Sequence, residues 1–562
     1  VSQHSGEPDD AITTDGDPIA FFPRRSEAYE FAALFPYPIS ETTSTAADGC
    51  TVTCTTYAAV GVTRLDNAYT IDTVSRPNDH DTGLYGLGHG WSLRFSSIEQ
   101  VDGTSYLRLG DGGSWEINFD DEGSHLRDYP LEDLTLEKEC GEFSAGGTAS
   151  YYRLTRTDGR REYFDADGRL IGIRDRYDNT ISLVHSVENG YPRIVITDTL
   201  GRTVVLSGAE SETGHVMTLT GPEGFSLRYE VTHADGLQAL AASTDAAGRT
   251  TRYSYTRQSV EFDASTHQNQ TMSADYLNLT TVTHPTQAQT VYTYSKTKRN
   301  LGPCGRTDIY KLVSRADRLG TETVNSRSYT YIRDCSGYPE YSDSSTLPGA
   351  FTYYTSVTDA IGRNTYITFN GYHLQTMVQV SAAEQRLYRT EYSYDSRRQP
   401  AEVRTYTYGG TDGNASMLSV TMEEHDSRGR LTASWSPLAE GDRDRTEYRT
   451  VYTYADSWDL PLSRTWKTDG DTTLEERNTP DETGKNIGRT ERYENGVLTA
   501  RTDFLYDALG RLTGERRYHD GFSAYDSIAY SYDSSEDGGS SFGEIRSGIL
   551  TADGTPAASP PG

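Results

Sequence analysis

The sequence has fewer basic than acidic residues, few cysteines and no long apolar run, and each shortage excludes a class of protein. Acidic residues outnumber basic ones by 82 to 52, which gives a formal charge of -30. Nucleic acids bind basic surfaces and anionic membranes repel acidic ones, so neither is an expected partner. No run of about 18 apolar residues is present, which excludes a membrane-spanning helix. Five cysteines in 562 residues exclude a small disulfide-dense domain.

The cysteines are not spaced as a complete metal site. Cys50 and Cys54 enclose Thr-Val-Thr, whose β-branched side chains favour an extended backbone with the two Cα atoms roughly 13 Å apart. A disulfide requires about 7 Å or less, so direct pairing would need a turn between them. A two-cysteine metal half-site is the alternative, but no second Cys/His pair stands nearby at ligand spacing. We expect the other three to be small core residues: Cys140, Cys304 and Cys335.

Tyrosine is more abundant than phenylalanine in this sequence, and arginine is more abundant than lysine. There are 41 tyrosines against 15 phenylalanines, and mean hydropathy is -0.67, so much of the apolar area belongs to rings with a polar tip. Such rings suit a pleated, half-solvated sheet. Nearly every cation is arginine, which pairs with carboxylates and stacks on tyrosine; a compositional bias would explain the same excess.

Two short units recur along the chain. The first is Asp-x-x-Gly-Arg, with a degenerate copy at Asp317–Gly320 and full copies at Asp165, Gly168 and Arg169; Asp198, Gly201 and Arg202; Asp245, Gly248 and Arg249; Asp359, Gly362 and Arg363; Asp426, Gly429 and Arg430; and Asp507, Gly510 and Arg511. The second is an aromatic pair two residues apart, at Tyr253/Tyr255, Tyr292/Tyr294, Tyr329/Tyr331, Tyr392/Tyr394, Tyr406/Tyr408, Tyr452/Tyr454, Phe504/Tyr506 and Tyr530/Tyr532.

Each unit has a physical interpretation as part of a β-hairpin. Residues two apart on a strand point to the same face, so each aromatic pair places two rings side by side on one surface. The Asp can accept a hydrogen bond from the backbone two residues on, and the Gly can adopt the positive φ that closes a type I turn. Strand, turn and returning strand follow one another in Phe504–Tyr518 and in Tyr163–Ile173, which predicts hairpins.

We therefore predict an all-β protein built of repeated antiparallel hairpins, which form a spiralling sheet and a partial or complete hollow cocoon. Residues 1–49 read as an N-terminal extension, 50–145 as a β-rich module, 146–535 as the repeat array, and 536–562 as a Gly/Ser/Pro-rich tail or linker. Helical signals are scarce, and the best candidate is Ser26–Phe35. The polar stretch that starts at Val1 lacks the pattern of a signal peptide, so we expect a mature or trimmed form.

These motifs resemble the YD repeats of bacterial Rhs proteins, of toxin-complex B and C components and of animal teneurins. The Tyr-Asp-x-x-Gly-Arg unit is nearly complete at Tyr506–Arg511 and partial at Tyr394–Asp395 and Tyr532–Asp533. The segment Tyr85–Leu93, with Asp111–Trp115 after it, resembles the Gly-x-Gly-Trp-Ser opening that precedes the repeats in many Rhs proteins. The resemblance covers roughly residues 50 to 535, and six phased copies make it specific.

The resemblance implies a β-sheet strip that spirals into a hollow shell and, in the toxin members, encloses a C-terminal toxic domain. It implies a non-enzymatic scaffold of a secreted or cell-surface bacterial polymorphic-toxin or contact protein, with an enclosed or adjacent polypeptide as partner. Rhs cores usually end in an Asp-Pro-x-Gly type segment tied to self-cleavage, and this sequence has none before Gly562. That departure puts toxicity and self-cleavage by this chain in doubt.

Other chemistries fit the residues less well, and we predict no catalytic residue, metal site or cofactor. Exposed tyrosines could bind glycans, which makes a carbohydrate-binding adhesin the alternative function, although core packing explains the same rings. A glycoside hydrolase could use paired carboxylates, but 82 acids supply such pairs by chance. No Gly-x-Ser-x-Gly elbow is present. Asp165–Gly168 resembles the start of a Ca²⁺ loop without its Glu, and His80 and His89 lack a third ligand.

Overall fold

The computed structural model describes most of the chain as β-strand with short connecting turns. Among the described residues there is no α-helix, which confirms the predicted all-β class. The candidate helix at Ser26–Phe35 and the residues Cys50, His80 and His89 lie outside the described part. The structure describes residues 37–45, 51–58, 85–88, 91–93, 95–101, 104–110, 114–120, 123–127, 129–234, 237–263, 271–300, 306–333, 352–370, 372, 374–383, 385–408, 415–468, 472–532 and 545–551.

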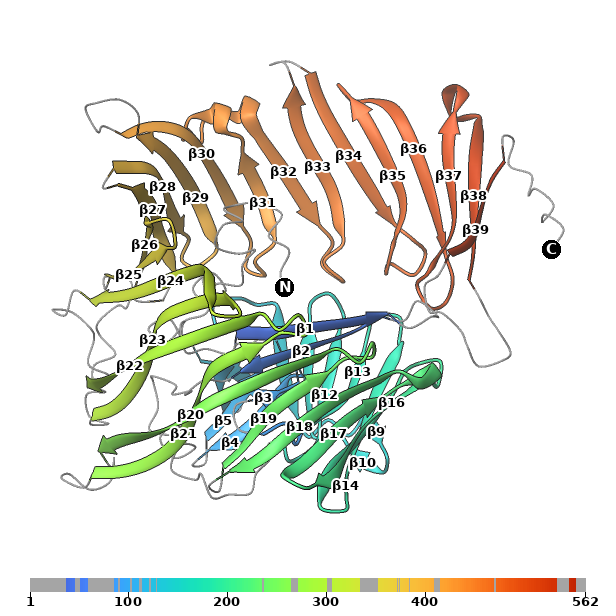
Figure 1. Ribbon diagram of the computed structural model, residues 1–562. Coiled ribbons are helices and arrows are strands. Elements are labelled where there is room, and N and C mark those ends of the chain that lie inside the picture. The colour runs from blue at the N-terminus through green and yellow to red at the C-terminus, as the bar shows by residue number, and fades with distance from the viewer. Residues whose placement is uncertain are drawn as a thin grey trace.

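One antiparallel strip forms most of the molecule, and nearly every strand pairs with its neighbours in sequence (Figure 1). Its first half comprises β8 (Leu134–Lys138), β11 (Tyr152–Arg156), β12 (Arg161–Phe164), β13 (Leu170–Arg174), β14 (Thr180–Glu188), β15 (Tyr191–Thr197), β16 (Thr203–Ser211), β17 (Gly214–Thr220), β18 (Ser226–Ala234), β19 (Leu237–Thr244), β20 (Thr250–Asp263), β21 (Thr271–Thr283), β22 (Gln289–Asn300), β23 (Arg306–Leu319) and β24 (Glu322–Arg333).

The second half continues the same meander. It comprises β25 (Thr352–Asp359), β26 (Arg363–Asn370), β27 (Gln375–Ala382), β28 (Gln385–Tyr394), β29 (Pro400–Tyr408), β30 (Ala415–His425), β31 (Leu431–Trp435), β32 (Arg449–Tyr454), β33 (Pro461–Thr468), β34 (Thr472–Pro480), β35 (Ile487–Glu494), β36 (Val497–Tyr506), β37 (Leu512–His519), β38 (Ala524–Tyr532) and β39 (Ile545–Thr551). Within the described strands β8 pairs with β11 and β39 with β38, and no ladder joins β39 to β8, so the strip is not closed into a barrel.

Three small sheets accompany the strip. The first contains β1 (Tyr37–Thr45), β2 (Thr51–Ala58) and β3 (Trp91–Ser92); the second contains β4 (Ser97–Val101), β5 (Thr104–Arg108), β6 (Ser114–Asp120) and β7 (Gly123–Leu126). The third is the hairpin of β9 (Ser144–Ala145) and β10 (Thr148–Ala149). Cys140 precedes this hairpin and is partly exposed, so the prediction that it is a core residue is wrong. Cys304 and Cys335 fall outside the described residues.

One face of the strip carries the aromatic pairs, and we call it the tyrosine face. Cross-strand partners share a face, and the register carries this face along the strip: Tyr253 lies opposite Val282, and Val282 lies opposite Thr290, two residues before Tyr292. The residue between the two rings of a pair points the other way and is exposed at Ser254, Thr293, Thr330, Ser393, Thr453 and Leu505. The predicted sharing of one surface by each ring pair is therefore confirmed at these positions.

The largest hydrophobic core lies on the tyrosine face of the first half. Tyr253 and Leu279 pack there with Leu87 and Trp91 from the segment before β4, so the tyrosine face of this half is the interior one. Small hydrophobic cores on the opposite face are covered by connecting segments of the strip. Phe143 stacks on Tyr163 with centroids 4.7 Å apart. The connection between β31 and β32 packs Ala439 against Val420, Met422, Ala433 and Trp435.

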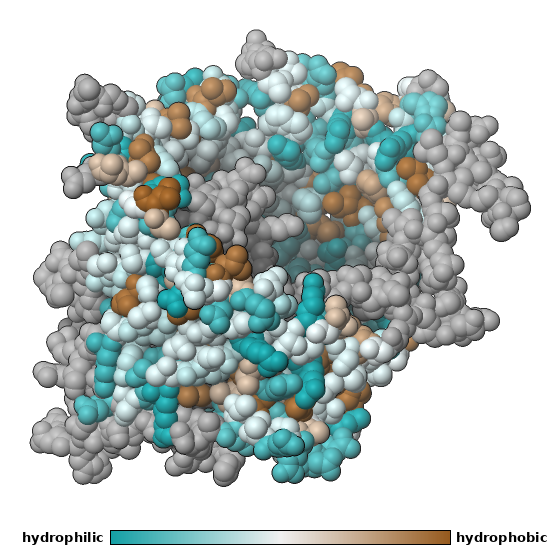
Figure 2. Space-filling view, in the orientation of Figure 1, coloured by the Kyte–Doolittle hydropathy of each residue, from teal (hydrophilic) through white to brown (hydrophobic). Residues whose placement is uncertain are grey.

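The strip bends so that its two halves lie opposite each other. In Figure 1 the second half, orange to red, stands above the first half, which is teal to green, and the blue strands β1 to β5 lie with the first half. Figure 2 shows the face of the molecule hollowed between the two halves. The predicted spiralling sheet with a hollow is therefore present.

Candidate functional site

The Asp-x-x-Gly-Arg unit forms a turn that the Asp side chain holds from inside. At Asp165 the backbone N–H donates to the Arg169 carbonyl (3.0 Å), and the Gly168 N–H donates to the Asp165 carbonyl (3.0 Å). Asp165 Oδ1 accepts the N–H groups of Asp167 (3.0 Å) and Arg169 (2.8 Å), while Oδ2 accepts from Arg169 Nε (2.8 Å). The same side-chain contacts recur at Asp198, Asp245, Asp359, Asp426 and Asp507.

The arginine of the unit pairs with the turn Asp in every full copy, but its exposure differs between copies. Arg202 Nε donates to Asp198 Oδ2 at 2.7 Å, and Arg249 Nε donates to Asp245 Oδ2 at 2.6 Å. The Arg202 side chain is 16% exposed, whereas that of Arg249 is 66% exposed. Exposed ion pairs add at most about 1 kcal/mol. The predicted structural role therefore suits Arg202 better than Arg249, whose turn depends mainly on the bonds from Asp245 to the backbone.

The turn glycines adopt the left-handed backbone that the turn chemistry predicts. The φ angles are 76° at Gly248, 79° at Gly362, 78° at Gly429 and 81° at Gly510, which confirms the prediction for these four. In this region an ordinary side chain costs about 1–2 kcal/mol because its Cβ crowds the following carbonyl. Gly168 and Gly201 share the geometry, with φ of 80° and 81°.

Further turns of this kind escaped the sequence motif. Asp175 accepts the N–H groups of Tyr177 and Asn179 at 2.8 and 2.9 Å, with Asp178 at φ 70° in the glycine position. Asp395, with Arg398 at φ 64°, and Asp481, with Gly484 at φ 69°, do the same, and the backbone of His284 closes a similar turn. Asp395 belongs to a partial Tyr-Asp unit of the sequence, but the missing glycine kept it out of the predicted turns.

The degenerate copy at Asp317 is not such a turn, and that part of the prediction is wrong. Asp317 lies inside β23, where it accepts hydrogen bonds from Thr290 Oγ1 (2.9 Å) and Asn325 Nδ2 (3.3 Å). The strand continues to Leu319, which pairs with Glu322, so Gly320 belongs to a tighter two-residue connection. At the segment that resembles the start of a Ca²⁺ loop, Asp165 and Asp167 both contact Arg169. The described residues contain no cluster suited to a metal ion.

In five pairs the second tyrosine joins two strands where they diverge. Tyr506 lies beyond the last ladder pair of β35 and β36, Arg489 with Asp503, and donates its hydroxyl to the Ile487 carbonyl (3.1 Å). The same bond runs from Tyr255 to Leu240 (2.7 Å), from Tyr294 to Leu279 (2.7 Å), from Tyr394 to Gln375 (2.6 Å) and from Tyr454 to Leu431 (2.8 Å). Burial raises the pKa of Tyr255 and Tyr294 well above the ordinary value.

The remaining pairs extend this picture. Burial raises the pKa of Tyr292 to about 12, and Tyr392 packs on the core formed around Phe369. Tyr452 lies on the tyrosine face opposite Arg464, while Tyr530 donates to Glu515 at 3.3 Å. The strand β38 includes Tyr532. The pair Tyr406/Tyr408 has no turn Asp after it and lies on the opposite face, where Arg389 stacks on Tyr406 at 4.6 Å.

We expect Tyr454→Phe to lower the free energy of unfolding by about 1 kcal/mol. The substitution keeps the ring and removes the one donor that the Leu431 carbonyl receives from Tyr454, so a partly buried hydrogen bond is lost. Urea denaturation would measure the change. Tyr493→Phe is the matched control, because its hydroxyl donates to Glu491 of the same strand, in a bond that does not join two strands; an equal loss in both variants would contradict the role of the bond between strands.

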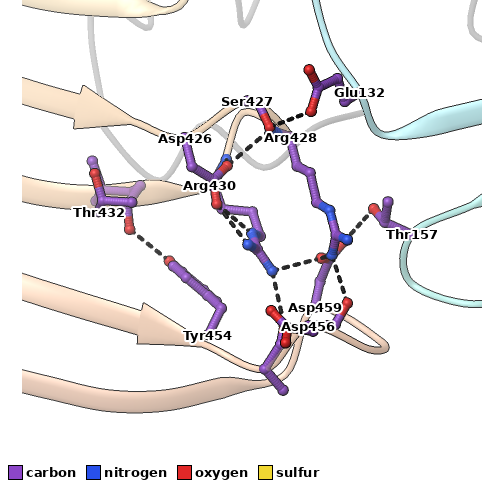
Figure 3. A network of polar contacts seen from close by, with 12 residues as sticks. Glu132, Thr157, Asp426, Ser427, Arg428, Arg430, Thr432, Tyr454, Asp456 and Asp459 are labelled. Carbon is purple, nitrogen blue, oxygen red and sulfur yellow. Dashed lines mark hydrogen bonds and ion pairs between the residues drawn. The ribbon is translucent and has the colours of Figure 1, made fainter.

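Turns from the two halves of the strip meet, and we call this contact the seam. Its members are residues 131–133, 157–160 and 175–179 from the first strands, and 426–430, 455–460, 481–486 and 507–511 from the later ones. Figure 3 shows its first part, where Ser427 donates its hydroxyl to Glu132 (2.6 Å) and the Glu132 N–H donates to the Ser427 carbonyl (2.9 Å). These two residues are 295 positions apart in the sequence.

Asp459 is the acceptor at the centre of this network (Figure 3). Its Oδ1 accepts from Arg430 Nη1 (2.9 Å) and Arg428 Nη1 (3.3 Å), and its Oδ2 accepts the hydroxyl of Thr157. Beside it Gly159 approaches the Trp458 ring so closely that an added Cβ would lie 2.2 Å from a ring carbon. The turn of Asp426 is thereby tied both to the next turn along the strip and to the opposite half.

The second part of the seam has the same construction. The Tyr177 hydroxyl donates to Asn486 Oδ1, and Asn179 Nδ2 donates to the Leu509 carbonyl (3.0 Å) across 330 positions. Gly510 meets the Tyr177 ring, where an added Cβ would lie 2.6 Å from the nearest atoms. Successive turns of the first half therefore meet successive turns of the second half in the same order.

Two turn carboxylates of the seam, Asp426 and Asp507, have lowered pKa values. Burial by itself raises the pKa of Asp426, but the Arg430 N–H and guanidinium outweigh it, and the net pKa lies below the ordinary value. The same balance, with Arg511 as partner, lowers the pKa of Asp507. Asp133 is the exception, since burial raises its pKa despite the hydrogen bond from Tyr129.

The residues before β5 contact both the interior of the strip and one of its turns. Trp91 Nε1 donates to the Tyr255 hydroxyl (2.8 Å), and the Ile98 N–H donates to the Gly168 carbonyl (2.9 Å). Of the opening motif, the structure thus places Trp91 on the tyrosine face, while Asp111–Gly113 lie outside the described residues. No helix in the described part is long and apolar enough to cross a membrane.

No family model matches the chain, and no curated protein matches it. Among solved structures it is similar to the crystal structure of TcdB2-TccC3-Cdc42, at 11% identity over 76% of this chain and 29% of that chain, with a TM-score of 0.18. A Tc holotoxin pore of Photorhabdus luminescens gives 11% identity, 80% and 30% coverage and a TM-score of 0.18. A porin-like protein of Bacteroides uniformis is 11% identical over 52% of this chain and 95% of that chain, with a TM-score of 0.16. The chain spans less than a third of the toxin-complex chains, and TM-scores this low carry no argument about its function.

Proposed function

We propose that the chain is a non-enzymatic scaffold that forms part of an encapsulating shell in a secreted or surface-located bacterial protein of the Rhs type. The observation that carries the proposal is the seam. It holds turns that are about 300 positions apart in the sequence against one another, so the strip curves back on itself and leaves a hollow (Figure 2). The motif resemblance supports the same function.

The tyrosine face supplies a lining for this hollow in the second half of the strip. Register places Tyr452, Arg464 and Glu476 in one row across β32 to β34. Arg464 is exposed and stacks on Trp466 of the same face at 4.6 Å. Because a continuous sheet keeps each face on one side, this row faces the hollow, as the buried rings of the first half face the core. Mixed charge and partly exposed aromatic rings suit a polypeptide guest.

A glycan-binding adhesin is the second candidate, and one observation limits it. Sugars stack on free aromatic faces, yet arginines cover outer-face rings: Arg501 lies 4.3 Å from the centroid of Tyr518, and Arg477 lies 4.4 Å from that of Tyr493. A glycan array on the purified chain tests this candidate directly. Strong binding to a defined glycan would favour the adhesin over the shell.

Two neighbouring cysteines on opposite faces would test the shell. In a background with the native cysteines replaced, Arg464→Cys and Lys467→Cys each put one thiol on β33, at exposed positions that point to opposite sides. We expect both to react with a small maleimide, and Arg464→Cys to react at least about tenfold more slowly with a 5-kDa polyethylene-glycol maleimide, because the hollow restricts large reagents. Equal rates for both thiols with the large reagent would overturn the proposal.

A further inference from the structure

His215 and His233 form a hydrogen-bonded pair, with His215 buried and His233 exposed, that fastens the segment around Gly86 to the interior of the strip. His215 lies in β17 with 0% of its surface exposed. Its Nε2 contacts the Gly86 carbonyl at 2.7 Å, and its Nδ1 contacts His233 Nε2, from β18, at 2.8 Å. Gly86 belongs to the segment 85–93, of which the structure describes 85–88 and 91–93. Leu87 and Trp91 of this segment are core residues, so the pair holds the point where the described residues around Gly86 cross β17.

Hydrogen-bond chemistry fixes the protons of the pair. A carbonyl oxygen only accepts, so His215 Nε2 must carry the proton that bonds to Gly86. In the neutral ring Nδ1 is then an acceptor, and His233 must donate its Nε2 proton to it. A further proton can enter at His233 Nδ1 with both bonds intact. A second cannot enter at His215 Nδ1, because that nitrogen already faces the N–H of His233.

The surroundings of His215 offer no anion to offset a positive charge within the described contacts. The Tyr191 ring of β15 packs on it with centroids 4.9 Å apart, and Tyr85 is buried in the same core. Across the ladders, Glu210 of β16 and Val231 of β18 lie opposite, and the Glu210 side chain is exposed. Burial, with the neighbouring His233 adding to it, lowers the pKa of His215.

We propose that the His215–His233 pair is an acid-sensitive latch that releases the segment 85–93 from the tyrosine face. The proposal does not depend on what the shell encloses. When the segment is released and solvated, His215 can take up a proton below about pH 6.5 as an ordinary histidine does, whereas in the closed pair the N–H of His233 occupies its Nδ1. Since the open form binds one proton more, the closed-to-open ratio falls as pH falls, by up to about tenfold per pH unit.

Hydrogen exchange followed by mass spectrometry tests the latch on the full chain. We expect the protection factors of peptides within 85–93, corrected for intrinsic exchange, to fall by up to about tenfold per unit between pH 6 and pH 5. Peptides that cover 355–369, in the core formed around Phe369 and without a described histidine contact, should keep their protection. His215→Gln should abolish the fall, because the Gln amide can donate to Gly86 and accept from His233 but does not titrate.

Two results separate the latch from general acid loosening. His185→Gln is the control. His185 of β14 is a partly buried histidine with a lowered pKa, and it bonds to the Leu170 carbonyl of β13. The substitution should leave the response of 85–93 unchanged. A fall in protection of the same size in His215→Gln and in the natural chain would overturn the proposal. If His215→Gln does not fold, the natural chain still decides, because an equal loss in 85–93 and 355–369 excludes a local latch.

Discussion

Replacing Gly168 by Ala should lower the free energy of unfolding by about 2–5 kcal/mol, one of the largest effects expected of a single methyl group in this chain. Two costs combine at this site. The left-handed backbone, with φ of 80°, opposes any side chain by about 1–2 kcal/mol. A Cβ would also lie 1.8 Å from the Ile98 carbonyl oxygen, which is backbone and can yield only if β4 moves away. Overpacking of this kind costs about 1–3 kcal/mol.

Gly248 provides the matched control for this prediction. It occupies the same position of the same turn unit, with φ of 76°, but no atom lies within 4 Å of its Cβ position. Gly248→Ala should therefore cost only the backbone share, about 1–2 kcal/mol. Equilibrium denaturation of both variants gives the difference. Equal losses would mean that Gly168 does not clamp the sheet of β4–β7 to the strip.

What the sequence predicted was local, and the physics of each repeat unit explains why. The Asp and Gly of a unit act on each other across a few residues, so the turn at Asp507 could be inferred from its own residues. The alternation of Phe504, Leu505 and Tyr506 likewise fixes which side chains share a face. Neither inference needs knowledge of the rest of the chain.

What the sequence could not predict depends on distant parts of the chain. Tyr177 and Asn486 meet across 309 positions, and neither residue lies in a motif that points to the other. The turn at Asp175 was missed, and Asp395 was identified only as part of a partial unit, because Asp178 and Arg398 adopt the left-handed backbone that the motif reserves for glycine. His215 gave no signal either, since its partner Gly86 lies 129 positions earlier. Curvature of the strip creates these long-range contacts.

The charge network of the seam should be the most sensitive polar element of the shell, and Asp459→Ala tests it. The substitution removes the acceptor of two guanidinium groups and one hydroxyl, in a place where the carboxylate is 22% exposed. Partial exposure keeps the expected cost below that of a fully buried pair, at about 2–4 kcal/mol. Asp459 has φ of 50°, which Ala tolerates less well than Asp and which adds to the loss.

The Asp459→Ala substitution should open the contact between the two halves of the strip along the seam. With Asp459 replaced by Ala, hydrogen exchange should accelerate in 157–160 and 426–430, and the thiol of Arg464→Cys should become accessible to the large maleimide. Asp442→Ala is the control, because Asp442 is an exposed turn acid that accepts from the Asp444 N–H and touches neither seam partner. If Asp459→Ala were as stable as Asp442→Ala and the large reagent were still excluded, the seam would not be what holds the two halves together. A loss confined to Asp459→Ala would instead show that one carboxylate, placed between two arginines and a threonine, keeps the strip curved around its hollow.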